Sequence, residues 1–314
     1  MTTVQQDQKY RLVTRSDMDG LVCAVLLREL DLIDDILFVH PKDMQDQKIA
    51  ITDRDITTNL PYVENAHIVF DHHLSETYRN EKGLANHVID PEAPSAARVI
   101  YKYYGGLERF GPFFDPMMEA VDKADSAQFS MDDVLNPQGW EFLSFLMDAR
   151  TGLGRFREFR ISNYNLMMDL IERCKSMAIA EIMELPDVKE RVEMYRSHEE
   201  QFKNQLLTRT KVYGNVVVFD IRDQDPIYAG NRFMIYALYP QCNVSIHVID
   251  GFRKQNTALA IGKSIFDRSC KTNIGELALK YNGGGHLNAG TCQVENDQAD
   301  AITLEVVKIL NENG

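Results

Sequence analysis

The sequence predicts an α/β protein of two domains: an N-terminal domain built on a parallel sheet and a smaller C-terminal α/β domain, with a cleft between them. Short, nearly all-apolar segments at 35–41 and 66–73 are typical of strands in a parallel sheet that is covered on both faces. Segments with helical apolar spacing follow them, as in α/β folds. A charged, helix-prone stretch with few apolar positions at 188–210 indicates a helix that bridges the two domains.

Residues 1–187 form the predicted N-terminal domain. It is expected to begin with a strand at 10–14, an acidic loop, and a helix with apolar spacing from Leu21. Residues 53–63, between the two apolar strands, are typical of a loop or a short strand. Helical patterns then cover 94–104, 114–125, 139–150 and 162–185.

Residues 211–314 form the predicted C-terminal domain. Strand signals separated by short breaks lie at 211–221, 234–240, 242–250 and 257–263, and an amphipathic helix at 301–310 closes the chain.

The cysteines, the apolar segments and the net charge exclude several classes of protein. The five cysteines include no CxxC pair, which argues against a disulfide framework and a zinc ribbon, so we expect reduced thiols in a cytoplasmic protein. No segment approaches the roughly 20 apolar residues that cross a bilayer, so no membrane association is expected. A formal net charge of -13 disfavours tight binding to long duplexes, because affinity for a phosphate backbone depends largely on Lys and Arg.

Two acidic motifs follow predicted strands. In "SDMDG", Asp17 and Asp19 lie two residues apart in the loop after the first strand, where open α/β sheets bind ligands. In "FDHH", His72 and His73 follow Asp71 at the end of another such strand, and imidazole with carboxylate suits Mn, Fe, Zn or Co. Adjacent side chains cannot point the same way, so one His is expected to bind metal and the other to face substrate.

Two further motifs are compatible with ligand binding. In "VDKADSAQF", Asp122 and Asp125 lie three residues apart near the end of a predicted helix and share a face if the helix persists. In "YNGGGHLNAG", three glycines allow the backbone to approach a ligand closely and to form an anion-binding nest, with His286 beside it. Arg268 lies upstream in a segment suited to phosphate contact.

Together, these motifs resemble the DHH phosphoesterase superfamily over nearly the whole chain. "SDMDG" is similar to its first motif, "FDHH" to the third, which gives the family its name, "DKADSAQF" to the fourth, and "GGGHLNAG" to the signature of the DHH-associated C-terminal domain. Members with this two-domain form include RecJ-type exonucleases, nanoRNases and cyclic-dinucleotide phosphodiesterases. The subgroup closest in appearance is usually labelled exopolyphosphatase-related.

The resemblance implies roles for particular residues. It implies that catalysis depends on Asp19, His72 and His73. The implied metal ligands are Asp17, Asp19, His72 and Asp125, with Asn59 aligned to a further position. The implied contacts with a substrate phosphate are Gly283, Gly284, Gly285, His286 and Arg268.

Two positions depart from the family pattern. Many members carry a His four residues before the first motif Asp, where this chain has Val13. The family also expects an Asp that bridges two metal ions, and the best alignment places Asn59 there. An amide oxygen can bind one cation but lacks the charge to bridge two. Asp53 or Asp55 fills this position if the alignment shifts by a few residues.

The resulting expectation is a metal-dependent phosphoesterase that uses one or two divalent ions, Mn above Mg or Co, to activate water. Its substrates are expected to be small phosphate esters or anhydrides: short single-stranded oligonucleotides, nucleotides, cyclic dinucleotides or polyphosphate. They are expected to bind in the cleft between the domains, with 188–210 as the hinge. The alternative is a nucleotide- or polyphosphate-binding protein whose catalysis is weakened by Val13 and Asn59. The sequence leaves open whether the chain forms a homodimer.

Overall fold

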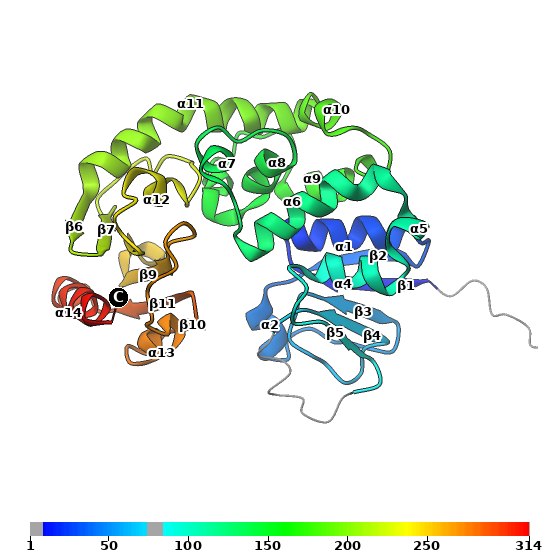
Figure 1. The fold of residues 1–314 in the computed structure, drawn as a ribbon, viewed down its shortest axis with the longest axis horizontal. Coiled ribbons are helices and arrows are strands. Elements are labelled where there is room, and N and C mark those ends of the chain that lie inside the picture. Colours follow the sequence, from blue (N-terminus) through cyan, green and yellow to red (C-terminus); the bar gives the residue numbers. More distant parts are fainter. Residues whose placement is uncertain (1–8, 74–83, 314) are drawn as a thin grey trace, which may run out of the picture. The chain divides into compact units, whose positions relative to one another are not determined.

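The computed structural model describes residues 9–73 and 84–313, which divide into two compact units (Figure 1). Of the described residues, unit 1 comprises 9–73, 84–128, Pro137–Ala149 and Gly154–Glu193. Unit 2 comprises Phe129–Asn136, Arg150–Leu153 and 194–313. Helix α11 spans Pro186–Arg209, over the range where the sequence predicts a charged helix, and its residues divide between the units. In the part of the chain that the structure describes, no helix has the length and apolar character to cross a membrane.

Unit 1 contains a five-stranded sheet of order β2-β1-β3-β4-β5 in which every neighbouring pair is parallel. This confirms the predicted fold class. Residues 53–63, typical of a loop or a short strand, contain β3. The strands are β1 (Tyr10–Thr14), β2 (Ile33–Phe38), β3 (Asp55–Thr58), β4 (Ile68–Asp71) and β5 (His87–Ile89).

Helix α1, Met18–Glu29, is the central helix of unit 1. Its residues from Met18 to Leu27 are all buried, as expected for a helix that packs against α4, α6 and α9 as well as the sheet. The other helices are α2 (Pro41–Gln45), α4 (Ala96–Tyr103), α5 (Gly106–Phe110), α6 (Asp115–Ser126), α8 (Gly139–Met147), α9 (Asn163–Arg173) and α10 (Ile179–Met183), with a short 3-10 turn at Pro112–Phe114.

Unit 2 contains a six-stranded sheet of order β10-β11-β9-β8-β7-β6. Only β7 and β8 pair in parallel, and the other pairs are antiparallel. Alternate residues of β9 and β11 are buried, which leaves one face of these strands on the core. The strands are β6 (Thr210–Tyr213), β7 (Val216–Asp220), β8 (Val244–Asp250), β9 (Thr257–Lys263), β10 (Gly284–His286) and β11 (Ala289–Val294).

The helices of unit 2 include one segment for which the strand prediction was wrong. Residues 234–240 carry a strand signal, but α12 occupies Met234–Leu238. Asn231 accepts a hydrogen bond from the backbone N–H of Phe233 at 2.9 Å and so starts a turn that continues as helix. The other helices are α7 (Met131–Leu135), α13 (Ile274–Leu279) and α14 (Ala299–Glu312), with a 3-10 turn at Phe252–Lys254. Two further 3-10 turns, at Ala149–Thr151 and Leu153–Arg155, each include residues of both units.

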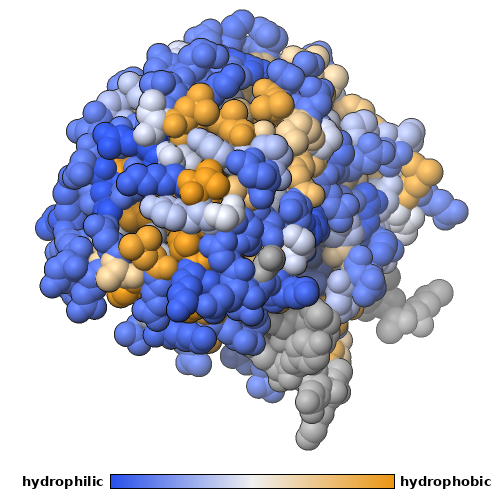
Figure 2. All heavy atoms as spheres, turned by 60° about the vertical axis from the view of Figure 1, so that its left-hand side comes forward, coloured by the Kyte–Doolittle hydropathy of each residue, from blue (hydrophilic) through white to orange (hydrophobic). Residues whose placement is uncertain are grey.

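Figure 2 shows one face of the molecule, which is mostly hydrophilic, with hydrophobic residues in separate patches. All five cysteines are buried free thiols, as the absence of a CxxC pair predicts.

Candidate metal centre

Asp19 is a nearly fully buried carboxylate at the start of α1, with 1% of its surface exposed. Its Oδ2 accepts a hydrogen bond from the backbone N–H of Ala96 at 3.1 Å, and its Oδ1 accepts one from Ala97 at 2.8 Å, both at the beginning of α4. Burial, followed by the negative charge of Asp125, raises the pKa of Asp19 to about 8. A nearby cation would therefore stabilise the ionised form of this carboxylate.

His72 and Asp125 form a close pair beside Asp19. His72 Nδ1 lies 3.2 Å from the carbonyl oxygen of Ala93, and because a carbonyl only accepts, this nitrogen carries a proton. His72 Nε2 lies 2.8 Å from Asp125 Oδ2. Burial alone would lower the pKa of His72, but the hydrogen bond and charge of Asp125 raise it to about 9. Because the proton is on Nδ1, neutral His72 has an acceptor at Nε2, which faces the acceptor Oδ2 of Asp125. This contact is favourable only if a proton or a cation lies between the two atoms.

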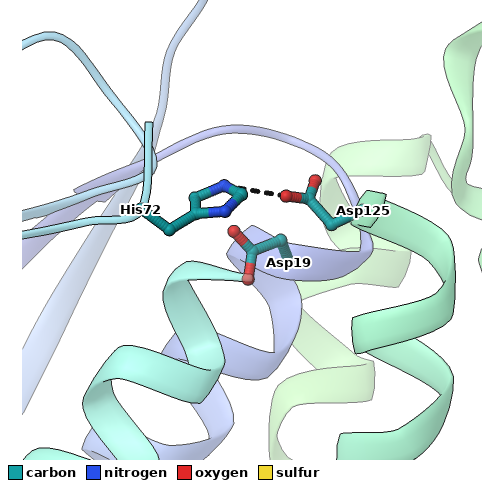
Figure 3. A group of neighbouring side chains, drawn as sticks. All are labelled: Asp19, His72 and Asp125. Atoms are coloured by element: carbon teal, nitrogen blue, oxygen red, sulfur yellow. Dashed lines mark ion pairs between the residues drawn. The ribbon is translucent and has the colours of Figure 1, made fainter. Parts of the chain in front are cut away.

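The three side chains converge on one point although they come from separate elements (Figure 3). Asp19 begins α1, His72 follows β4, and Asp125 lies near the end of α6. Their ligand atoms all lie within 4.8 Å of one another. Two carboxylates with one imidazole are a donor set that suits Mn²⁺, Fe²⁺ or Zn²⁺, and the unfavourable burial of Asp19 is consistent with a resident cation.

Asp71 orients the second histidine of the DHH motif. Asp71 is fully buried, and its Oδ1 accepts hydrogen bonds from the backbone N–H groups of His72 at 2.8 Å and His73 at 3.1 Å. The same oxygen lies 2.7 Å from His73 Nδ1. This carboxylate therefore orients the ring of His73, with Nδ1 as the hydrogen-bond donor.

Asp122, three residues before Asp125 on α6, belongs to a structural network instead. Its Oδ1 accepts a hydrogen bond from Ser95 Oγ at 2.8 Å, and its Oδ2 accepts two from the guanidinium of Arg98. Ser95 is also the N-cap of α4. Asp122 therefore fixes the start of α4, whose first N–H groups hold Asp19.

Asp17 lies outside the group formed by Asp19, His72 and Asp125. Its Oδ1 accepts a hydrogen bond from Gly20 N at 3.0 Å and caps α1, and its Oδ2 lies 3.1 Å from Arg15 Nε. Gly20 has to be a glycine, because a Cβ there would meet the carbonyl oxygen of Arg15 at 1.9 Å. The "SDMDG" motif thus builds a tight strand-to-helix turn as well as supplying Asp19.

Asn59 follows β3 at the same edge of the sheet. It is 1% exposed, its backbone has a φ of 54°, and neither Oδ1 nor Nδ2 has a hydrogen-bond partner among the described residues. Asp55 cannot replace it, since it lies at the other end of β3, about 13 Å away at the rise of a strand. There, Asp55 Oδ1 pairs with Arg11 Nε at 2.6 Å.

Val13 contributes to the core rather than to this site. It is fully buried in an apolar cluster with Met44, Ile51 and Val69. The position four residues before Asp17 therefore offers no ligand.

The glycine segment of unit 2 forms the hairpin of β10 and β11. A Cβ at Gly283 would meet the carbonyl oxygen of Thr291 at 2.3 Å, and one at Gly285 would meet that of Ala289 at 2.3 Å, so packing alone requires both. A Cβ at Gly284 would meet no atom within 4 Å. His286 and Arg268 are both exposed. Of the three glycines, Gly284 is the one whose open side can receive a ligand.

Sequence reasoning missed the residues that hold the site together. The backbone N–H groups of Ala96 and Ala97 have no side-chain signature, and the Ser95–Asp122 contact joins segments 27 residues apart. Arg15 lies beside the first motif, and its charge two residues before Asp17 was a signal that could have been used.

Comparison with known proteins places the chain in a family. Neither the protein-family models nor the curated proteins compared with it give a match. Among solved structures, it is 61% identical to the pGpG-specific phosphodiesterase PggH from Vibrio cholerae, over 98% of this chain and 100% of that one, with a TM-score of 0.86.

Two more distant structures share the fold. RecJ from Thermus thermophilus, in complex with Mn²⁺, is 14% identical over 97% of this chain and 52% of its own, with a TM-score of 0.52. CDC45 from Entamoeba histolytica is 10% identical over 96% of this chain and 95% of its own, also at 0.52. The likeness to PggH confirms the predicted phosphoesterase. The chain therefore belongs to the DHH phosphoesterase superfamily.

Proposed function

We propose that the chain is a divalent-metal-dependent phosphodiesterase that hydrolyses the linear dinucleotide pGpG to two molecules of guanosine monophosphate. The 61% identity to PggH over both chains supports this substrate, since PggH is a pGpG-specific phosphodiesterase. The observation that carries the metal dependence is the convergence of Asp19, His72 and Asp125 within 4.8 Å. Water adds across the internal diester, so that its phosphorus keeps the 5′-oxygen of one guanosine and releases the 3′-oxygen of the other.

We propose that Asp19, His72 and Asp125 hold one divalent cation, Mn²⁺ in preference to Mg²⁺ or Co²⁺. When bound, such an ion supplies Lewis-acid stabilisation of negative charge on phosphoryl oxygens. Imidazole favours Mn²⁺ over Mg²⁺, which prefers oxygen ligands and retained water.

The protein's own groups have complementary tasks in this proposal. The Ala96 and Ala97 N–H groups hold Asp19 in one orientation, and the Ala93 carbonyl does the same for His72. Asp71 keeps the proton of His73 on Nδ1, so that His73 Nε2 can donate or accept a proton at a substrate oxygen. In unit 2, Gly284, His286 and Arg268 are proposed to contact a terminal phosphate, with Gly283 and Gly285 shaping the hairpin.

The cytoplasm is the expected location, because all five cysteines are free thiols. A linear dinucleotide also suits an acidic chain, since it requires only local positive charge rather than a basic surface.

The test is hydrolysis by the full chain of a panel of substrates: pGpG, a cyclic dinucleotide, short oligonucleotides and polyphosphate. Each is incubated with Mn²⁺, Mg²⁺, Co²⁺ or a chelator, and products are separated by chromatography. We expect guanosine monophosphate from pGpG with Mn²⁺, loss of this product with chelator or in His72→Ala, and full activity in His40→Ala, which changes an exposed histidine elsewhere in unit 1. Binding of pGpG with a normal cation load but no product would instead favour a protein that binds without catalysis.

A further inference from the structure

Arg15 is the first residue after β1, and its side chain is an unassigned cation at the edge of the metal centre. Its Nε lies 3.1 Å from Asp17 Oδ2, while Asp17 Oδ1 accepts the N–H of Gly20. Both oxygens of Asp17 therefore have partners within the same turn. The side chain of Arg15 is 34% exposed, so a ligand at this edge can reach it.

The position beside Arg15 lacks the ligands that a second divalent ion needs. Val13 is buried in an apolar cluster, and Asn59 carries a neutral amide. Of the carboxylates predicted to bind metal, Asp19 and Asp125 face His72, and only Asp17 remains. A second divalent ion there would have one carboxylate, and it would have to displace the guanidinium from that carboxylate.

Arg15 lies at the same edge of the sheet as the candidate metal site. It follows β1 as His72 follows β4 in one parallel sheet, and its partner Asp17 is the N-cap of α1, whose first turn contains Asp19. The charge of Arg15 is therefore placed to offset negative charge at that edge.

We propose that the Arg15 guanidinium, held by Asp17, takes the place of a second metal ion and binds a non-bridging oxygen of the phosphate that is cleaved. This inference rests on the proposed phosphodiesterase function. A guanidinium has five N–H donors, and Nε is engaged with Asp17, so its terminal N–H groups can contact a phosphate while the ion pair fixes their direction. Because this charge is permanent, it can stabilise negative charge that develops on the phosphoryl oxygens.

A merely structural Arg15 would stabilise the turn without affecting phosphate binding. Arg11 provides a matched control, because it lies on the same strand and its Nε also pairs with an aspartate, Asp55, at 2.6 Å. The two side chains have similar exposure, 32% for Arg11 and 34% for Arg15, but Arg11 is at the opposite end of β1. Replacing either arginine removes an ion pair and can lower stability, but only replacing Arg15 removes a positive charge from the candidate metal site.

The experiment compares wild type, Arg15→Ala, Arg15→Lys and Arg11→Ala. Bound Mn²⁺ per chain is measured by equilibrium dialysis and elemental analysis, and steady-state hydrolysis of pGpG is measured with saturating Mn²⁺. We expect one Mn²⁺ per chain in all four proteins. Arg15→Ala should lose about 10²-fold in kcat/KM, the effect of removing one donor that stabilises developing charge. Arg15→Lys should recover part of that loss, and Arg11→Ala should retain wild-type kcat/KM even if its melting temperature falls.

An unchanged kcat/KM in Arg15→Ala, or two Mn²⁺ per wild-type chain, would overturn the assignment of Arg15. Failure of the proposed function would have a different signature, namely no hydrolysis of pGpG by wild type. In that case, the rise in melting temperature on adding pGpG with Mn²⁺ decides the role of Arg15. It should be lost in Arg15→Ala and kept in Arg11→Ala, and an equal rise in both variants would refute phosphate binding by Arg15.

Discussion

His72 Nε2 lies 2.8 Å from Asp125 Oδ2, which joins the residue after β4 to the last turns of α6. The contact is held from both sides, since the Ala93 carbonyl fixes the other nitrogen of His72 and the Asp19 carboxylate lies close to the pair. His72 Nε2 and the two carboxylates are all acceptors, so a proton or a metal ion has to lie between them for the contact to be favourable. The same side chains therefore form an ion pair or, as we propose, a metal site.

Asp125→Asn should reduce the affinity for Mn²⁺ by at least about tenfold, because an amide cannot supply the charge of a carboxylate ligand. Calorimetric titration of the metal-free protein with Mn²⁺ measures the change.

Asp122→Asn, three residues earlier in the same helix, is the control for that substitution. It removes the charge that pairs with Arg98 but keeps a side-chain oxygen that can accept from Ser95 Oγ and so maintain the start of α4. We therefore expect the free energy of unfolding to fall by about 1–3 kcal/mol while the affinity for Mn²⁺ stays within a few-fold of wild type. Equal losses of Mn²⁺ affinity in both variants would contradict the assignment of Asp125.

Asn59→Asp places a carboxylate at a buried position with no hydrogen-bond partner among the described residues. Without metal, we expect the free energy of unfolding to fall by roughly 3–5 kcal/mol, the effect of an uncompensated buried charge. With Mn²⁺, the melting temperature should rise more than that of wild type, because the new charge lies at the same sheet edge as the cation site. Thermal unfolding with and without Mn²⁺ tests this, and an equal rise in both proteins would place Asn59 outside the reach of the ion.

Alanine at two neighbouring glycines should separate packing from binding in unit 2. Gly283→Ala brings a Cβ against the Thr291 carbonyl and should lower the free energy of unfolding by about 1–3 kcal/mol. Gly284→Ala meets no neighbouring atom, so its stability should be close to wild type, whereas its KM for pGpG should rise if this backbone contacts a phosphate. Chemical denaturation and steady-state kinetics distinguish the two, and an unchanged KM in Gly284→Ala would remove this contact from the proposed substrate site.

The pH dependence of stability should include a contribution from His247 on β8. Burial, followed by the charge of Arg232, lowers the pKa of His247 from 6.5 to about 4. Between these values, the unfolded chain binds a proton that the folded chain does not, so the free energy of unfolding should fall as the pH is lowered from about 6.5 to about 4. Denaturant unfolding across this window measures the slope. His247→Gln should flatten it, and an identical slope in the variant would show that other groups cause the pH dependence.

The sequence predicted the two sheets, and it singled out Asp19, His72 and Asp125, which the structure brings together, because their signals are local. Apolar strands followed at once by Asp or His place those side chains at the carboxyl ends of neighbouring parallel strands, so Asp19 and His72 could be expected to lie close together. The prediction of Asp125 as a ligand depended on the order of the motifs. Helical spacing alone places Asp122 and Asp125 on the same face and does not say which of them is the ligand.

The remaining features depend on contacts that no short segment encodes. Asp122 is excluded from the centre by Arg98, and Asp19 is held by backbone groups that any residue would offer. The strand prediction at α12 was wrong because five apolar residues in a row do not distinguish a buried turn of helix from a strand. The sequence showed that position 13 carries an apolar residue instead of a metal ligand, but it did not show that Val13 packs in the core.

The number of Mn²⁺ ions that supports full pGpG hydrolysis tests the proposed single-cation phosphodiesterase most directly. Metal-free wild-type chain, at a concentration far above its Kd for Mn²⁺, is titrated with Mn²⁺ while the initial rate of guanosine monophosphate formation is followed. We predict a linear rise that reaches its plateau at one Mn²⁺ per chain. A plateau at two per chain, or no product at any ratio, would contradict a single-cation site formed by Asp19, His72 and Asp125.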